Sequence, residues 1–140
     1  MVGMSAEQQE SGLSGVWSGE YWYAGGDLRT QFAAHVVETA GSLGGTTLEN
    51  APGWGELSAV LTGARNGSDV TFTKVYDETK RLRASPIAYT GAADASLAVI
   101  EGEWVLLERN PLRGGFIMRR LPQAKQSAKR EMADTLTVVR

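Results

Sequence analysis

The sequence contains no cysteine, which excludes disulfide bonds, thiolate metal ligands and cysteine nucleophiles. Histidine is nearly absent as well, with His35 as the single example. One imidazole among scattered carboxylates lacks the spacing of a zinc site, and a Ser-His-acid triad would depend on this one residue. The glycine pairs at 25–26, 44–45 and 114–115 are typical of hairpin turns or strand starts rather than of a phosphate-binding loop. We therefore expect neither a metal ion nor another cofactor.

Basic side chains are not in excess. Lys and Arg number 14 against 16 Asp and Glu, for a net charge of −2. This balance lacks the electrostatic footprint of a nucleic-acid-binding protein. No apolar run approaches the roughly 20 residues of a membrane-spanning helix, and the first residues do not follow the pattern of a secretory signal. We expect a cytoplasmic protein that binds neither nucleic acid nor membrane.

Helical periodicity is absent until the end of the sequence. The chain has 140 residues, 42% of them hydrophobic, which suffices for one domain with a real core. We predict a flexible N-terminal arm over residues 1–14, a barrel over 15–120, and a C-terminal helix and tail over 121–140. Pro122 suits a first helical position. After it, residues recur at helical spacing at Ala124, Ala128, Met132 and Leu136.

The most informative stretch is Gly15–Tyr23, because its side chains alternate as on a β-strand. One face of that strand carries Gly15, Trp17, Gly19, Tyr21 and Tyr23. Two glycines among three aromatic rings suggest a concave surface, since bulky rings need small neighbours there. A small closed barrel has such a surface on its inside.

Seven further strand-like runs follow at short, even spacing. Asn66-Gly67, between two of them, is a strong hairpin signal. This pattern predicts an all-β fold, an eight-stranded antiparallel up-and-down (meander) barrel with a short C-terminal helix. The expected strands are Gly15–Tyr23, Thr30–Glu38, Leu43–Glu49, Glu56–Gly63, Asp69–Tyr76, Pro86–Gly91, Ser96–Glu108 and Gly115–Arg120.

Gly15-Val16-Trp17 on the first strand and Arg120 on the last resemble the signature of the calycins, the small barrels that include avidins, lipocalins and fatty-acid-binding proteins. In that family a basic residue of the last strand lies across the tryptophan at the closed end. Strand parity makes Arg120 the match, with Arg119 facing outward. The avidin-like layout fits best, but Ser18-Gly19-Glu20-Tyr21 lacks the asparagine of the avidin biotin site, so the resemblance implies the fold and not biotin binding.

If Trp17 marks the closed end, alternation sends a set of aromatic, aliphatic and polar side chains into one lumen, with Trp54 on a loop above its mouth. Inward glycines favour a cavity, and the alternative is that rings from opposite strands fill the gaps. The candidate ligand-binding residues are Tyr21, Tyr23, Phe32, Thr47, Glu49, Trp54, Phe72, Lys74, Ile87, Tyr89, Trp104, Leu106, Phe116 and Met118.

Glu49 and Lys74 are the charged residues of this set. An unpaired charge inside an apolar barrel is strongly disfavoured, so the two pair with each other or serve a ligand's polar group. A salt bridge or a place at the rim is the simpler interpretation. If the protein is an enzyme, the catalytic candidates are Glu49, Lys74, Tyr76 and Tyr89, which can transfer protons or donate hydrogen bonds.

These residues favour a barrel that binds a small apolar or aromatic molecule in its lumen. The first alternative is a cofactor-independent cyclase or isomerase acting on a polyketide- or terpenoid-like substrate. The second is an assembly protein whose barrel is filled. Apolar residues also point outward, which predicts a homodimer or homotetramer with Trp22 and Leu107 at the centre of the contact. The alternative is that the C-terminal helix covers this face. The outward apolar residues are Val16, Trp22, Val37, Val60, Val105, Leu107 and Ile117.

Overall fold

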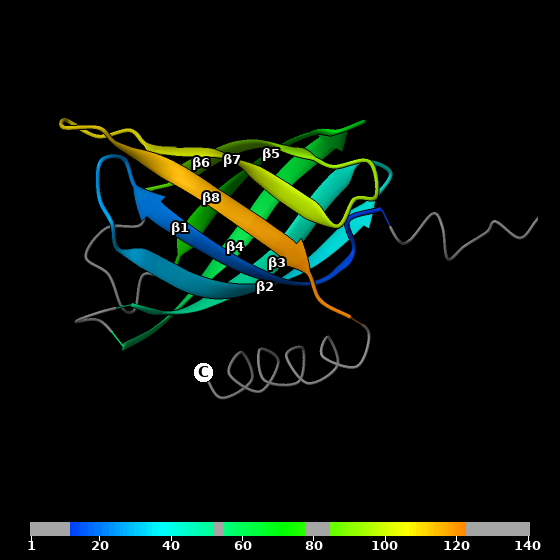
Figure 1. Cartoon of the computed structure of the whole chain (residues 1–140), viewed down its shortest axis with the longest axis horizontal. Coiled ribbons are helices and arrows are strands. Elements are labelled where there is room, and N and C mark those ends of the chain that lie inside the picture. Colours follow the sequence, from blue (N-terminus) through cyan, green and yellow to red (C-terminus); the bar gives the residue numbers. More distant parts are fainter. Residues whose placement is uncertain (1–11, 52–54, 78–84, 123–140) are drawn as a thin grey trace, which may run out of the picture.

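The computed structural model describes residues 12–51, 55–77 and 85–122, which form a closed antiparallel barrel (Figure 1). Each strand pairs with the next along the chain, and β8 pairs with β1 to close the ring. The predicted all-β fold and its strand order are confirmed. The strands are β1 (Gly15–Tyr23), β2 (Arg29–Thr39), β3 (Ser42–Ala51), β4 (Gly55–Asn66), β5 (Asp69–Tyr76), β6 (Ile87–Ala93), β7 (Val99–Leu106) and β8 (Leu112–Arg120).

Side-chain alternation along the strands separates the core from the surface. Strand β5 is a clear example, because buried positions at Val70, Phe72, Lys74 and Tyr76 alternate with more exposed ones. Since every strand has two neighbours, the inward sides of all eight merge into a single core. The hairpin at Asn66-Gly67 is confirmed: Asn66 pairs with Asp69, and Gly67 opens the two-residue turn with a φ of 64°.

Strand β7 is shorter than predicted and covers Val99–Leu106 instead of Ser96–Glu108. The carboxylate of Asp94 accepts hydrogen bonds from the backbone N–H groups of Ala98 and Val99, at 2.8 and 3.1 Å. Leu97 has a φ of 57°, in the left-handed region that strands do not use. This turn occupies the residues that the sequence pattern assigned to the start of the strand.

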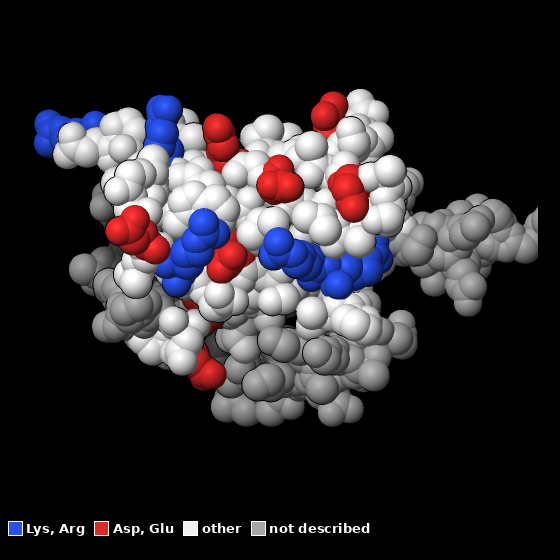
Figure 2. Space-filling model, in the orientation of Figure 1, with Lys and Arg blue, Asp and Glu red and all other residues white. Residues whose placement is uncertain are grey.

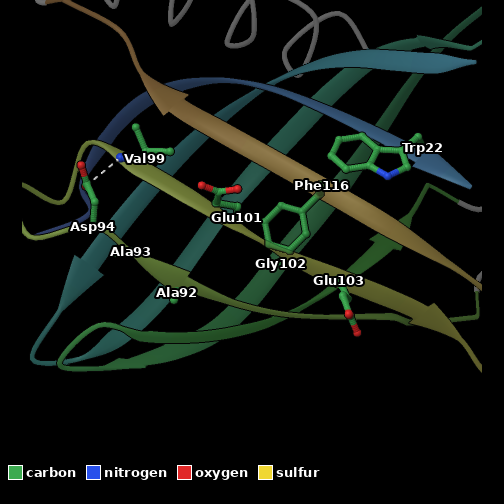
Figure 3. A pocket seen from close by; sticks show the side chains of 9 residues that line it. All are labelled: Trp22, Ala92, Ala93, Asp94, Val99, Glu101, Gly102, Glu103 and Phe116. Atoms are coloured by element: carbon green, nitrogen blue, oxygen red, sulfur yellow. Dashed lines mark hydrogen bonds between the residues drawn. The ribbon is translucent and has the colours of Figure 1, made fainter. Parts of the chain in front are cut away.

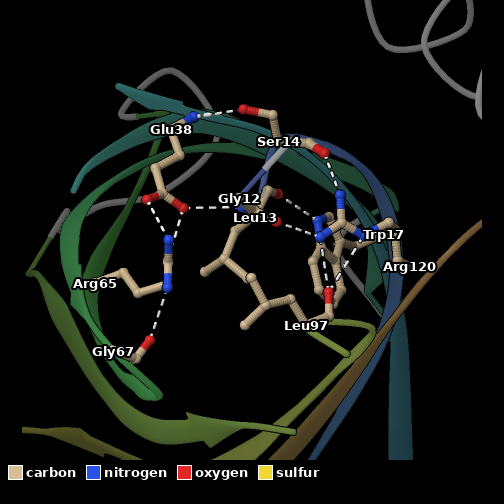
Figure 4. A network of polar contacts seen from close by, with 9 residues as sticks. All are labelled: Gly12, Leu13, Ser14, Trp17, Glu38, Arg65, Gly67, Leu97 and Arg120. Atoms are coloured by element: carbon tan, nitrogen blue, oxygen red, sulfur yellow. Dashed lines mark hydrogen bonds and ion pairs between the residues drawn. The ribbon is translucent and has the colours of Figure 1, made fainter. Parts of the chain in front are cut away.

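The closed end of the barrel is built on Trp17, which is completely buried (Figure 4). The guanidinium of Arg120 lies 5.0 Å from its ring centroid, whereas Arg119 is exposed, as parity predicted. Arg120 also donates hydrogen bonds to the carbonyl oxygens of Gly12, Ser14 and Leu97. One cation thus ties the last strand to the segment before β1 and to the β6–β7 turn.

Strand β1 begins at Gly15 as predicted, and the residues just before it, Gly12–Ser14, pack against the closed end of the barrel. Leu13 is only 1% exposed, and its carbonyl accepts a 2.9 Å hydrogen bond from the indole of Trp17. Its N–H donates to Glu38 at 2.8 Å, and Glu38 receives two 2.9 Å hydrogen bonds from Arg65 (Figure 4). Glu38 shares the inward parity of β2, and this signal in the sequence could have identified it.

The closed half of the lumen is filled by side chains. The cavity that remains there is about 10 Å³, no more than the space of one water molecule. Any lumen ligand must therefore lie nearer the mouth. The cavity is lined by Leu13, Trp17, Val36, Leu43, Leu61, Val70, Phe72, Ile100 and Met118.

The outward apolar residues differ in exposure. Leu107, Val60 and Val37 are 74%, 57% and 50% exposed, whereas Val16 is buried at 2% despite its outward parity. Residues 12–51, 55–77 and 85–122 contain no helix that could cross a membrane. The predicted C-terminal helix, most of the predicted N-terminal arm and Trp54 lie outside the described residues.

Candidate functional site

A carboxylate inside the barrel collects hydrogen bonds from three other side chains. Glu49 projects from β3 and accepts hydrogen bonds from the hydroxyls of Tyr21 and Tyr76, at 2.6 and 2.8 Å. The Nζ of Lys74 donates to the same carboxylate at 3.2 Å. These donors come from β1 and β5, far from Glu49 in sequence, and barrel closure brings them together. The salt bridge between Glu49 and Lys74 is present, and it lies in the core instead of at the rim.

Lys74 is surrounded by aromatic rings as well as by its carboxylate partner. Its side chain is 1% exposed, and its Nζ lies within cation–π distance of four ring centroids. The distances are 4.8 Å to Tyr21, 4.9 Å to Tyr76, 5.1 Å to Phe32 and 5.4 Å to Tyr89. The ammonium is therefore held by an ion pair and by ring faces, away from bulk water.

The phenols around Glu49 remain protonated at neutral pH. Burial, and then the negative charge of Glu49, raise the pKa of Tyr21, Tyr76 and Tyr89 far above the usual value for a phenol. At neutral pH these groups act as hydrogen-bond donors, not as bases.

Thr47 lies one inward position along β3 from Glu49, a step of about 7 Å in an extended strand. It is 3% exposed, and among the described residues its hydroxyl has no hydrogen-bond partner. Its neighbours across β2 and β4 are Ala34 and Ala59, whose side chains carry no polar group. A buried hydroxyl without a partner is uncommon. The Thr47 hydroxyl is therefore a place where a polar atom of a bound molecule could form a hydrogen bond.

Aromatic rings form much of the remaining inner wall. Phe72 and Tyr89 stack with centroids 4.7 Å apart and planes 11° apart, and Phe116 meets both edge-on. Nearer the mouth, Trp104 meets Tyr23 edge-on at 4.9 Å. Its indole donates to the carbonyl of Trp22 at 3.1 Å, which fixes the ring's orientation.

The inward glycines make room for these rings. A Cβ on Gly19 would lie 2.3 Å from the ring of Phe32, and one on Gly114 would lie 2.8 Å from the ring of Trp104. At Gly19 a ring face occupies the place of the missing side chain, and at Gly114 the backbone carbonyl of Trp22 lies even nearer than the ring. At these positions the space beside the glycine is therefore filled, as in the alternative prediction, and the glycines there do not indicate a cavity.

The other predicted ligand-binding residues do not form one group. Met118 and Phe72 line the small cavity of the closed half. Ile87 and Leu106 pair across β6 and β7 beside the core, and Tyr23 at the end of β1 is 48% exposed. The lumen residues that lie together around Glu49 are Tyr21, Phe32, Lys74, Tyr76 and Tyr89.

A second hollow, which the sequence pattern did not indicate, lies along the barrel wall beside β7 (Figure 3). It is open and has a volume of about 550 Å³. Glu101 and Glu103 project from β7 there, with Trp22 at one side, while the carboxylate of Asp94 is engaged with the backbone of Ala98 and Val99. Among the described residues, no group of three metal-ligating side chains occurs here or elsewhere.

On the face shown in Figure 2, acidic and basic side chains are interspersed. The surface pair Arg29–Glu20, at 3.2 Å, leaves Arg29 half exposed, and such pairs contribute little energy. The buried Glu49–Lys74 pair is thus the more informative feature. Comparisons of the chain with protein-family models and with curated proteins find no match.

Proposed function

We propose that the barrel binds a small, largely apolar or aromatic molecule in the mouth half of its lumen. The observations that support this most directly are the buried Glu49–Lys74 ion pair and the unpartnered hydroxyl of Thr47, one inward position away on β3, within a core of rings and aliphatic groups. A buried ion pair is often no more stabilising than apolar residues of similar volume. An unpartnered buried hydroxyl costs about 1–3 kcal/mol. Apolar residues at all three positions could give a barrel of similar stability, whereas a ligand with a polar atom gives these groups a use.

In this proposal each part of the wall has a separate role. Rings such as Trp104 and Phe32 provide apolar contact area, and Thr47 bonds the ligand's polar atom. Tyr21 and Tyr76 keep the Glu49 carboxylate oriented, since both phenols remain donors at neutral pH. A mostly apolar pocket with a few placed polar groups is typical of small-molecule sites.

The calycin interpretation supports the same conclusion. The closed barrel, its simple strand order and the Arg120 guanidinium over Trp17 all agree with that group. Proteins of this architecture use the barrel mouth for ligands.

Native mass spectrometry of the protein purified from its own cells tests the proposal directly, because a retained molecule would reveal its chemical class. In parallel, the fluorescent probe 1-anilinonaphthalene-8-sulfonate should bind the wild-type barrel. Trp104→Ala and Thr47→Val should change its affinity several-fold. Val37→Ala, an exposed position on the outer face of β2, is the matched control and should not. A barrel that retains no molecule and binds no probe would favour the filled assembly protein instead.

A second candidate is the cofactor-independent cyclase or isomerase. The observation that favours it is the hydrogen-bonded group in which Tyr21, Tyr76 and Lys74 all donate to Glu49. It places hydrogen-bond donors directly beside a carboxylate that can accept a proton. Such a set can polarise a carbonyl and move a proton. The two functions differ in what becomes of the retained molecule: a binding protein returns it unchanged, whereas an enzyme converts it, and Glu49→Gln should abolish that conversion.

A further inference from the structure

The ε-amino group of Lys74 can act as a nucleophile, a role beyond its salt bridge with Glu49. Among the described residues it is the sole lysine, and its side chain is 1% exposed among four aromatic rings. A lysine amine reacts with aldehydes and ketones once it has lost its proton. The Glu49 oxygen at 3.2 Å is placed to take that proton.

We propose that Lys74 captures an apolar aldehyde or ketone as a covalent imine inside the lumen. This inference rests on the proposed lumen binding and names its ligand class, a carbonyl compound. The hydroxyls of Tyr21 and Tyr76, which both donate to the Glu49 carboxylate, complete the hydrogen-bonded group around the amine's partner.

The reaction balances without an oxidant or reductant. Glu49 takes a proton from the Lys74 ammonium, and the free amine attacks the carbonyl carbon to form a C–N bond. Glu49 gives this proton to the carbonyl oxygen, which yields a carbinolamine with a protonated nitrogen. The nitrogen then passes a second proton to the Glu49 carboxylate, and Glu49 transfers it to the hydroxyl, which leaves as water as the C–O bond breaks and the C=N bond forms. Lysine ammonium plus carbonyl compound thus becomes protonated imine plus water, and the Glu49 carboxylate faces the iminium charge.

The geometry also favours retention of the imine once it has formed. Four ring faces hold a cation at Lys74, and they can hold the iminium in the same way. Burial limits the access of bulk water, which would otherwise hydrolyse the C=N bond. An alcohol of the same shape has no carbonyl carbon and can bind only non-covalently.

The test uses 6-methoxy-2-naphthaldehyde and its matched alcohol, 6-methoxy-2-naphthalenemethanol, with the wild-type chain. Non-covalent binding of each probe is followed by tryptophan fluorescence. Covalent capture is trapped with sodium cyanoborohydride and located by peptide mapping. We expect both probes to bind, the aldehyde alone to give an adduct, and labelling at Lys74 at least about ten-fold faster than at Lys125. Glu49→Gln should slow trapping about 100-fold, and Lys74→Arg should remove the adduct while it keeps the positive charge.

The outcomes separate the two proposals. If both probes bind but Lys74 is labelled no faster than Lys125, the imine inference is wrong and lumen binding stands. If neither probe binds and Lys74 is not labelled preferentially, both proposals fall. The wild-type measurement does not depend on whether any variant folds.

Discussion

Lys74 Nζ lies 3.2 Å from Glu49 Oε1 inside the barrel, and the two side chains are each 1% exposed. A pair removed from water in this way is sensitive to the loss of either member, because the remaining charge is then buried without its counterion.

Glu49→Gln and Lys74→Met should each lower the free energy of unfolding by about 3–5 kcal/mol. The double variant should be less destabilised than the sum of the two, with a coupling energy of about 1–3 kcal/mol. Urea denaturation of the four proteins in a double-mutant cycle measures this. Strict additivity would contradict an energetically coupled pair.

Raising the pH above about 10 should destabilise the barrel steeply. The pKa of Tyr21, Tyr76 and Tyr89 is raised in the folded state, so the unfolded chain releases phenol protons that the folded chain retains. Stability is therefore fully present below the ordinary phenol pKa and is lost as the pH rises above it. The loss is about 1.4 kcal/mol per pH unit for each phenol. Denaturation between pH 8 and 11.5, together with tyrosinate absorbance, tests this. Ordinary titration of all the tyrosines in a folded barrel would contradict it.

Arg120→Met should destabilise the closed end, whereas Arg119→Met should not. Arg120 covers Trp17 and bonds three backbone carbonyls, and its loss leaves these acceptors in a part-buried site. We expect a loss of about 2–4 kcal/mol for Arg120 and less than about 0.5 kcal/mol for the exposed neighbour. Chemical denaturation of both variants measures the difference. Equal losses of unfolding free energy in the two variants would mean that Arg120 does not stabilise the closed end.

Gly19→Ala should be destabilising by about 1–3 kcal/mol, because the new methyl group would meet the ring of Phe32. Gly44→Ala is the matched control, since a Cβ there has open space around it. That change should be neutral or slightly stabilising, as alanine restricts the unfolded chain more than glycine does. Thermal unfolding compares the two. A neutral Gly19→Ala would show that the Phe32 ring can move aside.

Period-two alternation explains why the fold was predictable. It assigns each residue to a face, and eight such runs joined by tight turns leave a closed meander as the simplest arrangement. The same alternation correctly distinguished Arg120 from Arg119 over Trp17. It also sent Glu49, Lys74 and Tyr76 inward together.

Alternation does not reveal how far along the barrel each side chain lies, nor how local hydrogen bonds redirect the chain. Residues that share a face can lie in different halves, which is why Met118 lines the closed half while Glu49 lies with the phenols. The side-chain hydrogen bonds of Asp94 shorten β7. Leu13 is buried through contacts with β2 and Trp17. Such long-range contacts leave no periodic signal in the sequence.

The β1–β8 seam has a consequence for the kinetics of folding. Every other strand pair is a hairpin between chain neighbours, but the seam joins Trp17 to Arg120 across almost the whole barrel sequence. Chain entropy must be lost to close so long a loop before the contacts of the seam can form and stabilise it. The seam therefore raises the contact order of the fold and slows folding. Hairpins should form first, and the emission of Trp17, which lies beneath the Arg120 guanidinium, should be the last signal to recover in a refolding experiment.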